Sequence, residues 1–438
     1  MRLSKILIMP LLMALCSVCA FAQHKNVHTL SIKEMFELAD SNNVSIKLHN
    51  IAMLEADERI KIAKNAYLPS IETSLSLSYN GDGIITDRDF SNSFSVEIPD
   101  FGNNFSIKAK QVIFAAGSIK NNVEISQVQS EITTLNARQN RQEIRFMIVS
   151  NYLEICEINN QLKIFDTHIQ QIEKVLNEMK IRHEQGTVLN NDVIRYELEL
   201  QNLNHQKAKL ENTKQILNNQ LLILLGLDEN TTFTPDTSEI DNMIMKSEEE
   251  LTKETLNTSI PMQLAQQNIL INEYKVRLSL SERLPKIVLF AFNNLDGPVT
   301  IDIPALNNNF NYWGVGIGIS YNIDNFYKSN KQIKADRLAL QKSKYQANLI
   351  KDKIKLESKA AYIKYREAFT LLQTKEKSLE LAKQNYETIN FRYHNGLALI
   401  TELLDATTQK LNAELEMVNA RINILFNYYK LQFISGTL

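Results

Sequence analysis

The stretch ICEINNQLKIFDTHIQQIEKVLNEM, residues 155–179, decides the fold class of this chain. Its apolar side chains recur alternately three and four residues apart, which is the spacing of the buried a and d positions of a coiled coil. These positions are Ile155, Ile158, Leu162, Phe165, Ile169, Ile172, Leu176 and Met179. The pattern predicts a long helix whose apolar stripe packs against other helices.

The distribution of proline predicts two long helical regions around this stripe. No proline lies between Pro99 and Pro235, and none follows Pro304. The first region should contain a helix from about Ala116 to Glu184, which at ~1.5 Å per residue would be roughly 100 Å long, more than a compact domain uses. Further stripes with similar spacing are Leu203, Leu210, Leu217 and Leu224, and Leu411, Leu415, Val418, Ile422, Leu425 and Tyr429.

The two helical regions are related by an internal duplication. Residues 182–186, RHEQG, correspond to residues 392–396, RYHNG, and the same spacing of 210 residues relates Gly226 to Gly436. One spacing shared over such a length indicates a duplication rather than chance. We therefore predict a first repeat at 23–226, an equatorial linker segment at 227–255 and a second repeat at 256–438.

The N-terminus has the features of a secretory signal peptide. Arg2 and Lys5 precede an apolar run that closes with Ala-Phe-Ala at 20–22, so we expect residues 1–22 to be removed on export. The mature chain then keeps only Cys156, which excludes an internal disulfide and a cysteine metal site. Because no later segment has the roughly 18 consecutive apolar residues of a spanning helix, the chain could enter a membrane only as strands.

Apolar and polar residues alternate in four shorter segments, as they do in strands with one apolar and one polar face. In the first of them, Ile71, Leu75 and Leu77 alternate with serines. The segments between the strands, Gly81–Asn104 and Asn293–Asn311, are rich in Asn, Asp and Gly and predict exposed loops. The expected strands are residues about 70–80, 104–112, 286–293 and 312–322.

Four strands are too few to close a barrel. An open sheet edge in lipid would leave backbone N–H and C=O groups unpaired, at a cost of several kcal/mol for each group. If the strands span a membrane, other copies of the chain must complete the sheet, and a cyclic trimer would supply about twelve strands. The polar face, with Gly314, Gly316 and Gly318 in its last strand, would then suit a water-filled lumen.

The chain resembles the TolC family of outer-membrane efflux proteins. Tyr393 and Gly396, followed by ITELLDATT at 400–408, match that family's tip motif, Tyr-x-x-Gly-x-x-x-x-x-Asp-x-Leu-Asp-Ala-Thr-Thr. The duplicated helix-strand-strand-helix plan and the Leu-Pro before each first strand extend the resemblance over nearly the whole mature chain. It implies a mostly α fold with a small β part. The homotrimer would join a 12-stranded outer-membrane β-barrel to a long periplasmic α-helical barrel.

The resemblance also implies a function and partners. The trimer would be the passive exit duct of a tripartite efflux pump or a type I secretion system, in the outer membrane of a Gram-negative-type cell. It would carry substrates across the periplasm and the outer membrane. Its partners would be a periplasmic adaptor (membrane fusion protein), an inner-membrane transporter and the lipid bilayer. The sequence leaves the cargo open, small molecules or protein, because the inner-membrane partner selects it.

A gate at the periplasmic helix tips is a further implication. Asp405 matches the second acid of the tip motif, and Glu402 stands where the first acid is usually Asp. By threefold symmetry these two residues would place six carboxylates around a constriction, which would favour cations there. Gly186 and Gly396 would form the tips that dock to the adaptor.

The family closes this gate with a lock between neighbouring helix pairs. Tyr393 matches a tyrosine that bonds to an acid, and Asp192 occupies the position of that acid. The family's arginine in the same lock falls at Ala398, so one link is missing. Closure would be weaker, or would depend on Arg392 or His394 instead.

Four of the candidate residues, Asp192, Glu402, Gly186 and Gly396, also have a simpler structural role. Asn191 and Thr401 have the character of helix N-caps, which would place Asp192 and Glu402 in a first turn, where the helix dipole stabilises an acid. The two tip glycines would be left-handed helix stops.

Composition and motifs argue against other classes of protein. With 48 Lys+Arg against 50 Asp+Glu, the chain has no positive charge excess for nucleic acid. The seven histidines lack metalloprotease spacing, and no phosphate-binding loop or serine elbow occurs, so we expect no enzyme, no cofactor and no metal site. Two alternatives remain. One is a periplasmic coiled-coil adaptor or scaffold, which would leave the strands without a purpose, and the weaker one is an exported enzyme on a helical scaffold.

Overall fold

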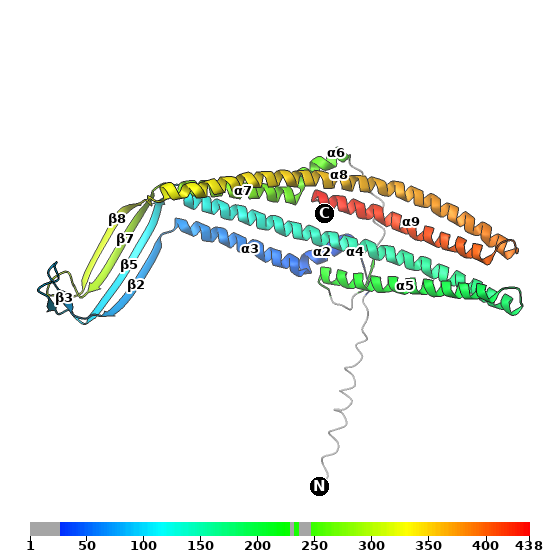
Figure 1. Ribbon diagram of the computed structural model, residues 1–438, viewed down its shortest axis with the longest axis horizontal. Helices are drawn as coiled ribbons and strands as arrows, with labels where there is room; N and C mark the ends of the chain where they lie inside the picture. Colours follow the sequence, from blue (N-terminus) through cyan, green and yellow to red (C-terminus); the bar gives the residue numbers. More distant parts are fainter. Residues whose placement is uncertain (1–26, 228–231, 236–246) are drawn as a thin grey trace, which may run out of the picture. The chain divides into compact units, whose positions relative to one another are not determined.

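The computed structural model describes residues 27–227, 232–235 and 247–438, and Figure 1 shows their elements along the chain. The long helices come as two hairpins, each with a short turn between its helices. The first hairpin is α4 (Ser118–Glu184) and α5 (Asn190–Leu225), and the second is α8 (Asn325–His394) and α9 (Ile400–Ser435). Shorter helices are α2 (Ile32–Asn42), α3 (Val44–Lys64), the 3-10 turn η1 (Asn65–Tyr67), α6 (Glu248–Thr258) and α7 (Ile260–Ser281).

The described residues form two compact units. One unit is drawn from the described residues within Met1–Lys47, Asn140–Thr255 and Leu356–Leu438, and the other from Leu48–Gln139 and Leu256–Lys355. Each unit therefore takes residues from both predicted repeats. The expected signal peptide at 1–22 and much of the expected linker at 227–255 lie outside the described residues, so those boundaries stay predictions.

A four-stranded antiparallel sheet lies in the second unit, with the strand order β2-β5-β7-β8. Its strands are β2 (Ser70–Tyr79), β5 (Phe101–Phe114), β7 (Lys286–Gly297) and β8 (Phe310–Ser320). Both repeats contribute two neighbouring strands, because β5 of the first repeat pairs with β7 of the second. Strands β2 and β8 form the two edges of the sheet.

The strand register gives the sheet one apolar face and one largely polar face. Directly opposed residues form rows across the four strands, such as Ile71, Ala109, Ala291 and Val315 on the apolar face. Adjacent rows lie on opposite faces because side chains alternate along a strand. The adjacent row, Ser70, Lys110, Phe290 and Gly316, therefore lies on the largely polar face. Large side chains of the apolar face, such as Ile71, are mostly exposed in the single chain.

The loops predicted at Gly81–Asn104 and Asn293–Asn311 are only partly loops. A short hairpin, β3 (Gly83–Ile85) with β4 (Phe94–Val96), forms inside the first of them. Strands β5 and β7 are longer than expected because their ends continue to pair, with Asn103 opposite Gly297. Turn-forming residues such as Asn and Gly did not end the strands, since cross-strand hydrogen bonding outweighs their weak local preference.

Two strands that the sequence pattern did not indicate pair in parallel. They are β1 (Val27–Leu30) and β6 (Thr232–Pro235). Each is four residues long, too short for a readable alternation. The start of α4 also differs from the expected Ala116, because Ala116 and Gly117 both have positive φ and form a turn before the helix.

The predicted coiled-coil stripe of α4 forms the core of the first unit. Its residues from Phe165 to Met179 pack with Val193, Tyr196 and Leu203 of α5 and with Leu411 of α9. Its preceding part, from Ile144 to Ile158, packs with side chains of α2, α5 and α9. Helix α4 therefore has apolar neighbours on several sides, which is why its stripe is almost completely buried.

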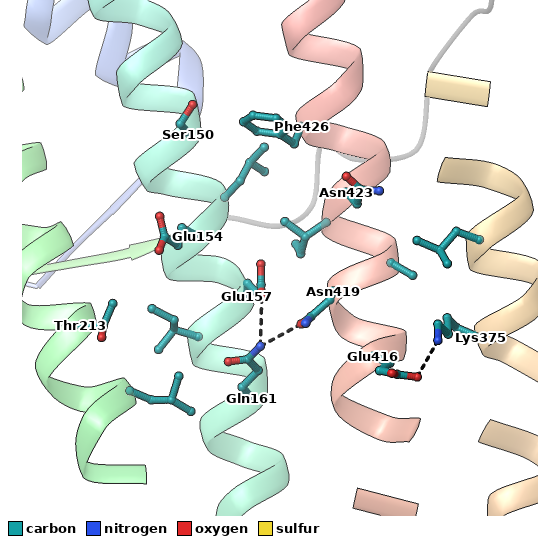
Figure 2. Close-up of a pocket in the computed structure, with 16 residues that line it drawn as sticks. Ser150, Glu154, Glu157, Gln161, Thr213, Lys375, Glu416, Asn419, Asn423 and Phe426 are labelled. Carbon is teal, nitrogen blue, oxygen red and sulfur yellow. Dashed lines mark hydrogen bonds and ion pairs between the residues drawn. The ribbon is translucent and has the colours of Figure 1, made fainter. Parts of the chain in front are cut away.

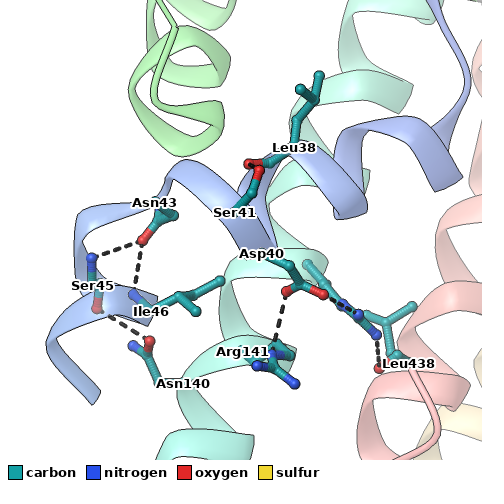
Figure 3. Close-up of polar contacts among 10 residues, drawn as sticks. Leu38, Asp40, Ser41, Asn43, Ser45, Ile46, Asn140, Arg141 and Leu438 are labelled. Carbon is teal, nitrogen blue, oxygen red and sulfur yellow. Dashed lines mark hydrogen bonds and ion pairs between the residues drawn. The ribbon is translucent and has the colours of Figure 1, made fainter. Parts of the chain in front are cut away.

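Helix α2 is fixed to α4 and to the end of the chain by charged groups, shown in Figure 3. The Asp40 carboxylate lies 2.7 Å from Arg145 Nη2 and 3.3 Å from Arg141 Nε. Arg145 also donates to the Leu438 carbonyl at 3.4 Å and lies over the ring of Phe36. One carboxylate thus joins two turns of α4.

The junction of α2 and α3 packs on the C-terminal end of α5. Asn43 is buried; its side-chain amide donates to the Leu224 carbonyl at 2.8 Å, and its Oδ1 accepts from the backbone of Ile46 at 3.2 Å. The next residue beyond α5, Gly226, has φ 63°, and a Cβ there would lie 2.8 Å from Asn42 Cβ. Both the left-handed backbone and the close approach require glycine here.

Candidate gate at the helix turns

The two helix turns that the duplication predicts have the same geometry. After α4, the Thr187 amide donates to the Arg182 carbonyl at 2.9 Å, and Gly186 has φ 75°. After α8, the Leu397 amide donates to the Arg392 carbonyl at 2.8 Å, and Gly396 has φ 72°. This bond across six residues is the Schellman motif, in which glycine adopts the left-handed conformation. Gly186 and Gly396 are therefore helix stops.

Both turns present exposed surface. A Cβ added at either tip glycine would meet nothing within 4 Å. Large apolar side chains flank the glycines and are mostly exposed, with Leu189 at 71% on the first turn and Phe391 and Leu399 at 70% on the second. Exposed apolar side chains grouped in this way commonly mark a contact surface for another protein.

The helices that leave these turns start two residues earlier than expected. Leu189 and Leu399 are the N-cap residues, and not Asn191 and Thr401. Asn191 and Thr401 lie inside the first turn, so that prediction was wrong, because a turn closed by glycine sets the helix start without a capping side chain. Asp192 and Glu402 do lie in the first turns, as expected.

Tyr393 of the second hairpin contacts the first hairpin near the turns. The guanidinium carbon of Arg182 lies 5.9 Å from the centre of the Tyr393 ring. Burial raises the pKa of Tyr393; the charge and hydrogen bond of Arg182 oppose this effect, whereas the charges of Asp192 and Glu178 add to it. The structure thus brings Tyr393 close to both Arg182 and Asp192, and the interaction with Asp192 acts through its charge.

The basic residue at this site is one that the sequence reasoning missed. Arg392, one of the two expected candidates, donates to the Leu397 carbonyl at 3.1 Å within its own turn. His394, the other, packs edge-on against the Tyr393 ring. Arg182 is the counterpart of Arg392 in the first repeat, so the duplication itself carried the signal that could have identified it.

Two further tyrosines, Tyr196 and Tyr386, belong to the same contact region as Tyr393. Tyr196 of α5 is 2% exposed, and burial raises its pKa, as do the neighbouring Tyr393 and Tyr386. Burial also raises the pKa of Tyr386 of α8, whose ring carries the Lys410 ammonium at 4.6 Å from its centre. The two tyrosines stay neutral at physiological pH. Tyr196 of the first hairpin lies close to Tyr386 and Tyr393 of the second, so it connects the two hairpins.

The two remaining gate candidates lie on the exposed side of α9. Glu402 accepts a hydrogen bond from the Leu399 amide at 3.1 Å, which satisfies a free donor at the helix start. Asp405 accepts from Gln409 at 2.8 Å, one helical turn further on. Both carboxylates are exposed in the single chain. They lie on the same face of the helix because they are three residues apart.

A cavity of about 600 Å³ lies between α4, α5, α8 and α9, away from the turns. Figure 2 shows hydrogen bonds and an ion pair among some of its polar side chains. Gln161 donates to Glu157 at 3.0 Å, and Lys375 lies 2.7 Å from Glu416. Burial raises the pKa of Glu157. Because these groups satisfy one another, the cavity shows no sign of a ligand site.

Within residues 27–227, 232–235 and 247–438, no three His, Cys, Asp or Glu side chains are grouped to hold a metal ion. The Cys156 thiol is buried beside the α4 stripe, and burial raises its pKa to about 12, so it is a poor nucleophile. No helix in the described part of the chain combines the length and the apolar character needed to cross a membrane.

Comparison with known proteins identifies the family. The model of the outer membrane efflux protein family matches residues 36–227 and 251–437, which is most of the chain. The chain belongs to the outer membrane efflux protein family. No curated protein matches the sequence.

Solved structures of outer-membrane channels share the fold. The channel OprN matches with a TM-score of 0.77 at 16% identity, over 93% of this chain and 90% of that one. VceC from Vibrio cholerae matches with a TM-score of 0.77 at 14% identity, over 92% and 96%. CusC matches with a TM-score of 0.79 at 14% identity, over 92% of each chain. At such low identity the likeness establishes the fold alone.

Membership of the outer membrane efflux protein family gives the location of the chain. It is an outer-membrane protein with a periplasmic extension, of a family of channels rather than enzymes. The apolar face of the sheet and the long helices are the two parts that this location requires.

Proposed function

We propose that three copies of this chain form a passive exit duct, which carries substrates from an inner-membrane transporter across the periplasm and the outer membrane. The duct would belong to a tripartite efflux pump or a type I secretion system. The observation that carries the proposal is the sheet β2-β5-β7-β8, which has one apolar face, one polar face and two open edges. Such a sheet is suited to a membrane only as part of a closed barrel.

Closure with other copies satisfies the open edges. Strand β2 at one edge and β8 at the other each leave one side of their backbone without a strand partner in the single chain. Joining β8 of one copy to β2 of the next would pair these groups and place Ile71 and Val315 on the lipid side. Three copies supply twelve strands, which leaves a lumen lined by the polar face.

The turn region would be the gate of the duct. Tyr393 of the second hairpin, held between Arg182 and Asp192 of the first, would lock the two hairpins together at the tip. Glu402 and Asp405 would form the carboxylate ring of the constriction. The exposed turns at Gly186 and Gly396, with their apolar neighbours, would dock the periplasmic adaptor.

Planar-bilayer conductance of the detergent-extracted protein tests the proposal. The unmodified protein should give small, cation-preferring steps, because the gate is closed and negatively charged. Replacing Glu402 and Asp405 together by glutamine and asparagine should lower the cation preference several-fold. The variants R182A and Y393F should each raise the conductance, because the lock between the hairpins is weakened.

A matched control separates the gate from general charge effects. Glu131 is an exposed carboxylate of α4, far along that helix from the turn. E131Q should leave both conductance and selectivity unchanged. If the gate variants behave like E131Q, the gate assignment is wrong while the duct stands. If the unmodified protein gives no conductance at all, the duct is wrong.

A further inference from the structure

The face of the sheet that the sequence predicts as polar carries a row of aromatic rings. Phe290 and Phe292 of β7 project on the same face as Ser106 and Lys108 of β5, because the register places Lys108 opposite Phe292 and Lys110 opposite Phe290. The opposite face holds the apolar residues assigned above to lipid. These two phenylalanines would therefore face the lumen of the proposed duct.

The glycines of β8 make room for these rings. A Cβ added to Gly314 would lie 2.8 Å from the Phe292 ring, and one added to Gly316 would lie 2.7 Å from the Phe290 ring. The rings thus reach across to β8 and occupy the space that side chains at these two glycines would fill. Glycine paired with an aromatic residue across strands is a stable arrangement, because the ring covers the exposed backbone.

The row continues along the face through two more rings. The Phe290 and Phe292 rings are nearly parallel, with centres 6.4 Å apart. The Tyr312 ring follows 6.1 Å from Phe292, and the Phe310 ring lies 5.2 Å beyond Tyr312. We call these four residues the aromatic row. Phe290 and Tyr312 are each 37% exposed and Phe310 is 53% exposed, so the row offers accessible ring surface.

The charges beside the row are unevenly distributed. At the end with Phe290 and Phe292, the exposed ammonium groups of Lys110 and Lys108 project on the same face, and the only acid in these two cross-strand rows is Glu72, opposite Lys108. At the other end Asp296 accepts hydrogen bonds from Asn104 and Tyr312. Accessible rings next to lysines are chemically complementary to a planar aromatic molecule that carries a negative charge.

We propose that the aromatic row, with Lys108 and Lys110, is a binding track for planar aromatic anions that pass through the barrel. The inference rests on the proposed duct and adds a substrate class to it. A planar ring system stacks on Phe290 and Phe292 while its anionic group faces the lysines. The successive rings, each within about 7 Å of the next, let such a molecule move along the wall without losing its contact.

Equilibrium binding tests the track without depending on conduction. The probe is naphthalene-2-sulfonate, titrated by calorimetry into the full-length, detergent-solubilised protein. F290L and F292L together should weaken binding by roughly 10-fold, since each stacked ring contributes a few-fold to affinity. K108Q and K110Q together should weaken it by roughly 3- to 10-fold. Hexane-1-sulfonate and 2-naphthylmethylammonium should bind the unmodified protein several-fold more weakly.

The matched control is Phe105, a β5 residue on the apolar face, opposite Leu75 and Leu295. F105L removes a ring of the same size from the same sheet, so it corrects for effects on folding and on detergent. If F105L weakens binding as much as the double variant F290L/F292L, or if neither set of variants changes it, the track is wrong.

Single-channel recording separates this proposal from the duct itself. In the unmodified protein, naphthalene-2-sulfonate should lengthen the intervals during which the ionic current is blocked. In the double variant F290L/F292L the ionic current should remain, but the blocked intervals should be several-fold shorter. Ionic current with identical blocking in both proteins refutes the track and keeps the duct. Absence of any ionic current refutes the duct, and the calorimetric comparison then decides the track on its own.

Discussion

Helices α4 and α8 are counterparts in the two repeats, yet they use their apolar residues differently. Counted back from the shared turns, Leu153 of α4 corresponds to Ile363 of α8. Leu153 is 3% exposed, whereas Ile363 is 58% exposed. Ile148 is completely buried, and its counterpart Ser358 is also buried but has a much smaller side chain.

The difference follows from the number of neighbours that each helix has within the chain. Helix α4 packs against residues of α2, α5 and α9. In α8, Ala361, Tyr365 and Ala368 form a smaller cluster with residues of α9. Large side chains of α8, such as Leu349 and Leu356, remain 70% and 71% exposed. The first repeat thus supplies the internal core. The second repeat keeps a large apolar stripe for contacts outside the single chain, as the proposed trimer requires.

The largest effect should come from truncating a buried residue of α4. L153A should lower the free energy of unfolding by about 2–5 kcal/mol, because it leaves a cavity in the core. The counterpart I363A should change it by less than about 0.5 kcal/mol in the dissociated chain, but should weaken association of the copies. Urea unfolding and native mass spectrometry measure the two effects. Equal losses for both variants in the dissociated chain would contradict the comparison.

The buried pair of His168 and Glu414 joins α4 of one repeat to α9 of the other. His168 Nε2 lies 2.8 Å from Glu414 Oε2, and the His168 side chain is 1% exposed. E414Q should lower the free energy of unfolding by roughly 1.5–3 kcal/mol, because it removes a charge-assisted hydrogen bond from a buried partner. The exposed substitution E387Q on α8 is the control and should have almost no effect.

This pair also predicts a dependence on pH. Burial raises the pKa of Glu414, but the bond and charge of His168, with Lys410 and Lys383, lower it, so the pKa lies below its ordinary value of 4.5. A lowered pKa in the folded state stabilises the fold above the unfolded pKa, and this contribution is lost as the pH falls through the folded value. Unfolding midpoints measured from pH 6 downwards should therefore fall less steeply for E414Q. Parallel curves would show that Glu414 does not titrate with folding.

Glycine substitutions compare a packed helix end with an open one. G226A should cost about 1–3 kcal/mol, since it adds a close contact with Asn42 to the strain of a positive φ. G396A has the same strain but open space around it, and should cost about 1 kcal/mol. Thermal unfolding followed by circular dichroism gives both values. A larger loss for G396A would mean that the turn, and not the α2 junction, is the more constrained site.

A small effect should come from the ion pairs between α2 and α4. D40N should cost about 1 kcal/mol, because Asp40, Arg141 and Arg145 are all partly exposed and water replaces much of the interaction. Hydrogen exchange should rise in α2 and stay unchanged in α9. Exchange that rises equally in both helices would show that the ion pairs support the whole first unit.

Local patterns in the sequence determined the elements of this protein. The three-four spacing from Ile155 to Met179 gave the stripe of α4, and the alternation around Leu75 and Ile317 gave the strands, because periodicity alone decides which face of an element is apolar. The duplication located both turns, since left-handed glycine after a helix has a clear local signature. The helices and strands could thus be predicted without knowing which other elements they pack against.

Only the tertiary structure decided which helices and strands pack against one another. It placed Arg182 of the other repeat over the Tyr393 ring, a basic residue that the sequence reasoning did not name beside Arg392 and His394. Packing between distant segments, and not the local spacing, decides that contact. It also laid Phe290 and Phe292 over the glycines of β8, so that a face predicted as polar became partly aromatic. Such pairings depend on strand register and on which helix faces which, and these are fixed by packing over the whole chain rather than by local preference.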